Sequence, residues 1–139
     1  MKLLTLLMAS GVLATLLFSA CNKKDDATAQ TTLQKLQYKW TFDKEYDNSF
    51  YGGLNHRDTT LGVAGDYFDF RTDNKMYVKV GAFPDTLSYS LIGDTKIVFT
   101  SGGFHDTAVI QVLNATNLQF YGYSGTPSSY DEYTDYLHK

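Results

Sequence analysis

Several residue types are scarce in this chain, and each scarcity narrows what the protein can be. The 139 residues include one cysteine and two prolines. With a single thiol the chain cannot form an internal disulfide, so its folded part must depend on its core alone. Lysine and arginine number 12 against 15 acidic residues, for a net charge of -3. This balance argues against a nucleic-acid partner, because proteins that bind nucleic acids present a basic stripe.

Long apolar runs are also absent, except at the N-terminus. Lys2 is followed by an apolar stretch over residues 3–18 and by the small residues Ser19 and Ala20. A positive start, an apolar centre and small residues before a cleavage point are typical of a secretory signal peptide. A membrane-spanning helix needs about 20 apolar residues, and this stretch is shorter. We therefore predict a cleaved signal over residues 1–20 and no membrane-spanning helix in the mature chain.

The only cysteine, Cys21, stands directly after this signal. The tetrad Phe18-Ser19-Ala20-Cys21 resembles the lipobox of bacterial lipoproteins, although Phe18 occupies a position that is usually leucine. The resemblance implies that the thiol of Cys21 is lipidated and that the membrane is a partner of the mature protein. Each buried methylene contributes about 0.8 kcal/mol, so several acyl chains together anchor a protein firmly.

Residues 22–26, with the sequence Asn-Lys-Lys-Asp-Asp, are charged, and residues 27–32 are polar. Such a composition is typical of a solvated tether, which we place at residues 21–32. The lysine followed by two acidic residues also resembles the surface-export signal of Bacteroidota-type lipoproteins. This resemblance implies an outer-membrane lipoprotein that faces the cell exterior.

The rest of the chain, residues 33–139, is long enough for one domain and rich in aromatic residues. Eleven tyrosines, nine phenylalanines and one tryptophan favour strands, because aromatic side chains suit a pleated, half-buried surface. Apolar and polar residues alternate without a break over residues 36–43, as in a half-buried strand. Similar strands are expected at residues 67–71, 76–80, 87–91, 97–99, 107–113 and 118–121. We predict an all-β fold, an antiparallel meander closing into a barrel of about eight strands.

Two segments fit this pattern less well. Residues 48–65 are long, glycine-bearing and weakly patterned, so we expect a loop that contains a short strand near residues 59–63. A loop of this length is uncommon in a compact domain and is often functional. Residues 130–138 suit either a strand or a helix, and we favour the strand, because a barrel needs a last strand to cover its open edge.

Several of these segments resemble lipocalin-like lipoproteins, a group whose ligand is unknown. The resemblance starts at residues 36–40, where a short hydrophobic turn leads into a strand bearing Trp40. It implies a lipocalin-like barrel over residues 33–139. A retinoid-type ligand is not implied, because Tyr38 stands where classical lipocalins have the glycine of Gly-x-Trp. The other segments that carry the resemblance are residues 65–70, 73–75, 85–89, the strand at Ile97, and the paired strands 110–113 and 118–120.

No catalytic motif is recognisable, so we expect no enzymatic activity and no cofactor. Residues 122–125, Gly-Tyr-Ser-Gly, lack the fifth position of a nucleophile elbow and favour a turn. His56 beside Asp58 and His105 beside Asp106 are residue types that zinc accepts. Nothing in their spacing requires a metal, and we favour solvated loop histidines.

Asp43, Glu45 and Asp47 alternate along one strand, so the simple period of two places them on one face. Three carboxylates of this kind are suited to calcium. The same face carries Lys39 and Thr41, and we favour a solvated outer face without a metal.

Aromatic side chains supply the candidate binding residues. We assign Trp40, Phe42, Phe68, Phe70, Phe99 and Phe120 to the core. The remaining tyrosines exceed what a small core needs, and tyrosine suits binding surfaces. We expect a non-catalytic envelope protein that binds a small hydrophobic molecule or a glycan at a mouth formed by residues 48–65 and 101–106. The alternative is a filled barrel that contacts a protein or glycan through outward tyrosines. The candidate ligand-binding residues are Phe50, Tyr51, His56, Phe104, His105 and Tyr123.

Overall fold

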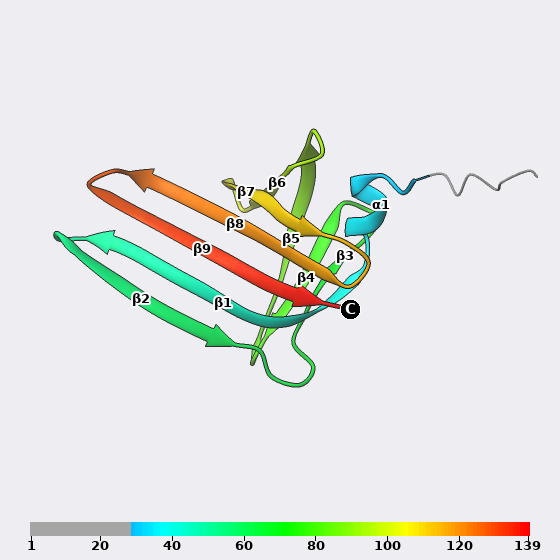
Figure 1. The fold of residues 1–139 in the computed structure, drawn as a ribbon, viewed down its shortest axis with the longest axis horizontal. Helices are drawn as coiled ribbons and strands as arrows, with labels where there is room; N and C mark the ends of the chain where they lie inside the picture. Colours follow the sequence, from blue (N-terminus) through cyan, green and yellow to red (C-terminus); the bar gives the residue numbers. More distant parts are fainter. Residues whose placement is uncertain (1–28) are drawn as a thin grey trace, which may run out of the picture.

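A computed structural model describes residues 29–139, which form nine strands and one short helix (Figure 1). The predicted signal peptide, Cys21 and the charged residues after it lie outside the described residues. Within residues 29–139, no helix is both long and apolar enough to cross a membrane. The elements in chain order are α1 (Thr32–Leu36), β1 (Lys39–Tyr51), β2 (Leu54–Leu61), β3 (Tyr67–Phe70), β4 (Lys75–Val80), β5 (Phe83–Ile92), β6 (Lys96–Ser101), β7 (Phe104–Leu113), β8 (Asn117–Thr126) and β9 (Ser129–His138).

The strands form a closed antiparallel barrel of eight strands with one extra strand. From β3 to β9, each strand pairs with the next, and β1 closes the ring by pairing with β3 on one edge and with β9 on the other. The extra strand, β2, shares an edge of β1 with β3: β2 pairs with residues 44–51 and β3 with residues 39–41. The predicted all-β barrel of about eight strands is confirmed, and so is the strand predicted at residues 130–138.

The predicted loop at residues 48–65 is wrong over most of its length. These residues continue β1 and then form β2, so that β1, β2, β8 and β9 make a four-stranded sheet extending beyond the other strands (Figure 1). The turn between β1 and β2 is Gly52-Gly53, and both glycines have the positive φ that a tight hairpin turn requires. Every residue of β2 is exposed, which explains why no alternation of apolar and polar residues marks this strand.

The N-terminal prediction also needs correction, because Leu36 ends a helix and does not begin a strand. Thr31 caps α1: its hydroxyl accepts a hydrogen bond from Gln34 N, and the Gln34 side chain accepts one from Thr31 N. This reciprocal capping box stabilises the first helical turn. The buried Trp40 Nε1 donates to the carbonyl oxygen of Leu36 at 2.9 Å, which ties the end of α1 to the first strand.

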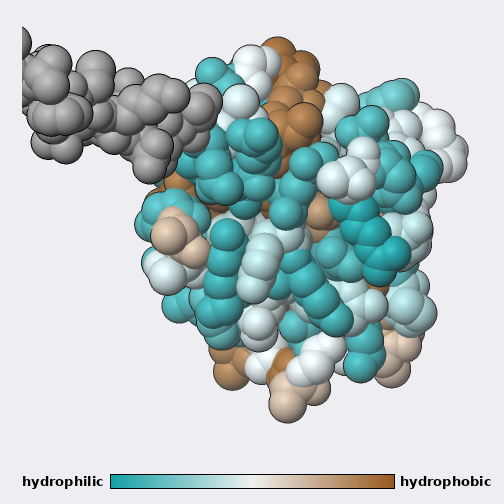
Figure 2. Space-filling model, turned by 90° about the vertical axis from the view of Figure 1, so that its right-hand side faces the viewer, coloured by the Kyte–Doolittle hydropathy of each residue, from teal (hydrophilic) through white to brown (hydrophobic). Residues whose placement is uncertain are grey.

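The hydrophobic core fills the end of the barrel next to α1. All six aromatic residues assigned to the core are buried, as predicted, and Phe42 stacks on Phe68 with ring centroids 5.4 Å apart. On its surface, the end of the molecule that carries α1 presents mainly hydrophilic side chains (Figure 2). Buried Asp66 accepts hydrogen bonds from Val63 N and Gly81 N and thereby joins the β2–β3 connection to the β4–β5 turn.

A β-bulge in β1 changes which side chains enter the barrel. The register with β9 shifts between Phe42 and Lys44, because Phe42 pairs with Leu137 and Lys44 with Tyr136. One extra residue reverses the face of every side chain that follows. Asp43 keeps the outward direction that alternation gives it, and its carboxylate lies 2.6 Å from His138 Nδ1. Glu45 instead turns into the barrel, and Asp47 lies on the same face of β1 as Glu45. The prediction that Asp43, Glu45 and Asp47 share a solvated outer face is wrong for this reason.

Candidate functional site at the barrel mouth

The end of the barrel opposite α1 is not filled by side chains. A pocket of about 220 Å³ lies there, and each of the eight barrel strands contributes at least one lining residue. Its floor is apolar and comes from six different strands. Because a ligand pocket needs mainly apolar walls with a few polar groups, this composition suits a small organic molecule. The apolar lining residues are Phe68, Met76, Val78, Leu87, Phe99, Phe104 and Phe120.

Two carboxyl groups, those of Glu45 and Asp135, also line this pocket. They are directly opposed on β1 and β9, and Asp135 is only 3% exposed. Burial, together with the charge and the hydrogen bond of Glu45, raises the pKa of Asp135 well above its ordinary value. Burial and the charge of Asp47 likewise raise the pKa of Glu45. Oδ1 of Asp135 is inaccessible to solvent and has no hydrogen-bond partner.

A tyrosine crosses the pocket beside this acid pair. Tyr133 on β9 donates a hydrogen bond of 2.5 Å to Asp106 Oδ2 on β7, although β8 lies between these two strands. Gly122 on β8 makes the crossing possible, because a Cβ atom there would lie only 2.1 Å from the Tyr133 ring. Burial and the bond to Asp106 raise the pKa of Tyr133, which keeps its phenol protonated and able to donate.

The charges around the mouth all have one sign. Asp47 and Asp58 are directly opposed on β1 and β2, and both raise the pKa of Glu45 through their charge. Within residues 29–139, every lysine and arginine on a strand points to the outer face, as strand alternation and register require. Opposed like charges destabilise a sheet, and no lysine or arginine on a strand offsets this repulsion from the inner face. We call Glu45, Asp47, Asp58, Asp106 and Asp135 the acidic mouth.

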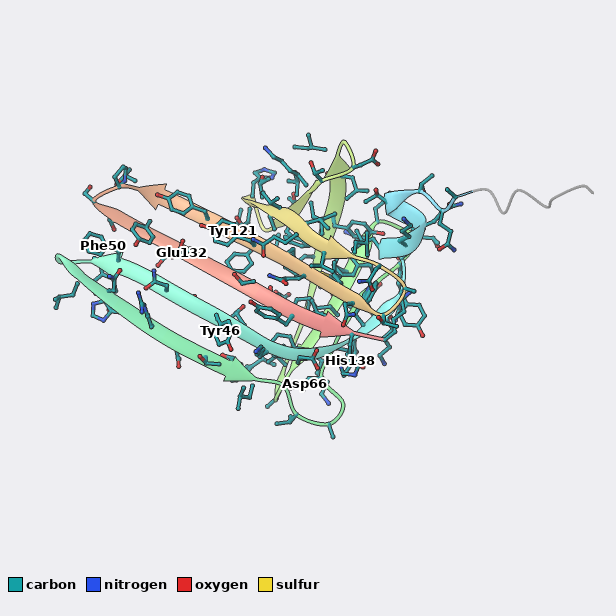
Figure 3. All side chains as sticks on the ribbon, in the orientation of Figure 1. Tyr46, Phe50, Asp66, Tyr121, Glu132 and His138 are labelled. Atoms are coloured by element: carbon teal, nitrogen blue, oxygen red, sulfur yellow. The ribbon has the colours of Figure 1, made fainter. Side chains whose placement is uncertain are left out.

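A second concave site lies on the outer face of the four-stranded sheet, over β1, β2, β8 and β9 (Figure 3). It is a groove of about 380 Å³, and Glu132 is one of its lining residues. Glu132 accepts hydrogen bonds from Asn48 Nδ2 at 2.7 Å and from the Tyr121 hydroxyl at 2.8 Å. Burial, with the bond to Glu132, raises the pKa of Tyr121 to about 12. Oδ1 of Asn48 is inaccessible to solvent and has no partner.

Aromatic rings flank this outer groove. Tyr130 stacks on both Phe50 and Tyr123, with centroid distances of 5.5 and 5.6 Å. Tyr46 meets Tyr136 edge to face at 5.5 Å, and the ammonium group of Lys44 lies over both rings. The surplus of tyrosines noted in the sequence is therefore concentrated mainly on this face.

The six predicted ligand-binding residues do not form a single site. Phe104 lines the pocket at the mouth, whereas Phe50 and Tyr123 belong to the outer aromatic rings. Tyr51 and His56 stack on each other at 3.9 Å near the β1–β2 turn. His105 lies on β7, where its Nδ1 is 3.1 Å from the Thr100 hydroxyl. Among residues 29–139, no three histidine or acidic side chains are grouped closely enough to hold a metal ion.

Sequence reasoning missed Asp135, Tyr133 and Asp106 as parts of one site. Asp135 alternates with Tyr133 and Leu137 on one face of its strand, and this position is the signal that could have indicated a buried carboxyl group. Glu45 could not have been assigned to the interior, because the bulge that turns it inward leaves no mark in the pattern.

Comparisons of the chain with models of protein families, with curated proteins and with solved structures find no match.

Proposed function

We propose that this chain is a lipid-anchored protein of the bacterial envelope that binds a small ligand at the mouth of its β-barrel and does not transform it. The observation that supports this most strongly is the pocket to which all eight barrel strands contribute. A pocket of about 220 Å³ is small among ligand sites, so the ligand is of the size of a single-ring compound. An eight-stranded barrel has an interior just wide enough to hold one such molecule.

The lipocalin-like character of the barrel and its outer-membrane location are part of the same proposal. The first is supported by the strand pattern and Trp40, and the second by the lipobox and the charged residues that follow it. A tethered binding protein of this kind would hold its ligand at the cell surface or in the periplasm.

Replacing Cys21 with serine tests the anchor. We expect the wild-type protein to incorporate a labelled fatty acid and to sediment with membranes, and the Cys21→Ser variant to lose both properties. The physical reason is that only the thiol accepts the lipid, and several acyl chains bind a bilayer strongly. Metabolic labelling and membrane fractionation measure the two effects. A variant that still sediments and carries label would contradict the proposed anchor.

A second candidate function rests on the outer groove. Its hydrogen-bonding centre at Glu132, the unpartnered Oδ1 of Asn48 and the flanking aromatic rings resemble what a sugar needs, namely polar contacts for hydroxyls and apolar planes for the ring faces. In this alternative the chain contacts a glycan or a glycan-bearing partner through its outer face.

One experiment separates the two candidates. The full-length protein is extracted from its native host and analysed by native mass spectrometry for a retained small molecule. We expect the wild-type protein to retain a small molecule. Val78→Trp should abolish this retention, because the indole ring fills the pocket, whereas Tyr121→Ala should leave it unchanged. Loss with Tyr121→Ala alone would favour the outer groove. Retention unaffected by Val78→Trp in a folded variant would overturn binding at the mouth.

A further inference from the structure

The barrel mouth combines an apolar floor with an uncompensated group of carboxylates, and these two features together select one class of ligand. This inference rests on the proposed function, because it concerns the ligand of the same pocket. Asp135 and Glu45 line the pocket together with phenylalanine and aliphatic side chains. Any molecule that enters therefore meets apolar walls on most sides and carboxyl oxygens on one side.

Asp135 differs from the other acids at the mouth because it is buried and only partly hydrogen-bonded. It lines the pocket and is 3% exposed, and its Oδ1, which solvent does not reach, receives no hydrogen bond. A buried carboxyl oxygen without a donor is an unstable arrangement unless a bound group supplies the donor. No lysine or arginine on a strand supplies it, because these side chains face outward, and the neighbouring Glu45 is itself a carboxyl group.

The missing donor must be a cation or a strong hydrogen-bond donor, and the surroundings favour an organic cation over a metal ion. Divalent metals need several oxygen or nitrogen ligands, and the residues described provide no group of three. An ammonium group has three donors and needs only a few acceptors, and Glu45 and Asp135 can supply them. Its hydrocarbon part would occupy the apolar floor formed by residues such as Met76 and Phe99.

We propose that the barrel mouth binds a small amphiphilic amine, with its ammonium group between Glu45 and Asp135 and its apolar part on the phenylalanine floor. Asp47 and Asp58, at the outer part of the same face, attract the cation toward the pocket. Tyr133, held by Asp106, borders the cation on the side of β7 and β8. The amine is the only part of the ligand that the carboxyl groups specify.

Three probes that share a phenyl ring and differ in charge test this proposal: 2-phenylethylamine, 2-phenylethanol and 3-phenylpropanoate. The full-length lipidated protein is placed in nanodiscs of zwitterionic lipid, and binding is measured by equilibrium dialysis with empty nanodiscs as the blank. We expect the amine to bind about tenfold or more tightly than the alcohol, because a hydrogen bond to a charged group is stronger than one between neutral groups. The carboxylate should show no binding above the blank.

Matched variants that each remove one charge identify the groups responsible. Asp135→Asn should reduce amine affinity to that of the alcohol, and Glu45→Gln should weaken it in the same direction. Asp94→Asn removes one negative charge from the exposed turn between β5 and β6, and it should change neither the affinity for the amine nor that for the alcohol. Circular dichroism confirms that each variant is folded before binding is compared.

The other outcomes are distinguishable. Equal affinities for the amine and the alcohol would show that the ligand is not selected as an amine. The proposal that a ligand binds at the mouth would still stand. Displacement of the amine by millimolar Ca²⁺ would overturn it in favour of a metal site. If no probe binds but the native protein retains a molecule that Val78→Trp abolishes, the amine class fails and the proposed function stands. If no probe binds and no molecule is retained, both fail.

Discussion

Replacing Trp40 with alanine is expected to lower the free energy of unfolding by about 3–5 kcal/mol, the usual range for removing a fully buried large aromatic side chain. Trp40 has no exposed surface and lies in the core at the α1 end of the barrel. The variant also loses the only side-chain bond from Trp40 to α1, the donation from Nε1 to the Leu36 carbonyl oxygen. Urea denaturation followed by circular dichroism measures the change.

Two further variants separate the contributions to this effect. Trp40→Phe keeps an aromatic ring but leaves the buried Leu36 carbonyl without its donor, so we expect a smaller loss of about 1–3 kcal/mol. Phe83→Ala is the exposed control, because this phenylalanine is 82% exposed. It should change stability by less than about 0.5 kcal/mol. A Trp40→Ala variant as stable as Phe83→Ala would contradict the packing described for the α1 end.

Replacing Asp135 with asparagine is expected to stabilise the unliganded protein at neutral pH and to flatten the dependence of its stability on pH. The folded state holds the proton of Asp135 to a higher pH than the unfolded chain does, because burial and Glu45 raise its pKa above 3.8. The folded state therefore binds more protons above that pH, and its stability falls as the pH rises toward the raised pKa. Asparagine cannot ionise, so this loss disappears in the variant.

The expected gain at pH 7 is about 1–3 kcal/mol, the range associated with an unsatisfied buried polar group. Thermal melts at pH 4 and pH 7 measure it, and the gain should be smaller at pH 4, where the wild-type carboxyl group is neutral. Glu45, Asp47, Asp58, Asp106 and Tyr133 face the same region and remain in both proteins. Asp94→Asn, in the exposed turn between β5 and β6, is the matched control. A variant less stable than wild type at pH 7 would show that the Asp135 charge is compensated in the folded state.

Together these two predictions assign different roles to the two ends of the barrel. The α1 end is filled with aromatic side chains and supplies stability, whereas the mouth holds a carboxyl pair whose removal should increase stability. Proteins commonly accept such a local loss where a site must bind something, because the groups that bind a ligand are unsatisfied without it. The Asp135→Asn variant should therefore gain stability and lose amine binding for the same reason, namely the removal of one buried charge.

Local patterns were sufficient to predict most of the barrel. Alternation identified the strands around Phe68, Met76 and Leu118, because a half-buried strand leaves a period of two in its residues. The same logic failed for β2, whose residues are exposed on both faces, and for Leu36, where a capped helical turn replaces the first part of a predicted strand. Periodicity detects burial, so a strand or turn without a patterned buried face is not detected.

The sequence by itself determined an all-β barrel and the aromatic residues of its core, because both depend on residue type and local spacing. Only the tertiary structure decided which side chains meet at the mouth. The bulge between Phe42 and Lys44 turns Glu45 inward, the closure of β1 on β9 sets it opposite Asp135, and Gly122 lets Tyr133 reach Asp106. These contacts join residues up to 90 positions apart (45 and 135), and they depend on register and strand order, which no local pattern records.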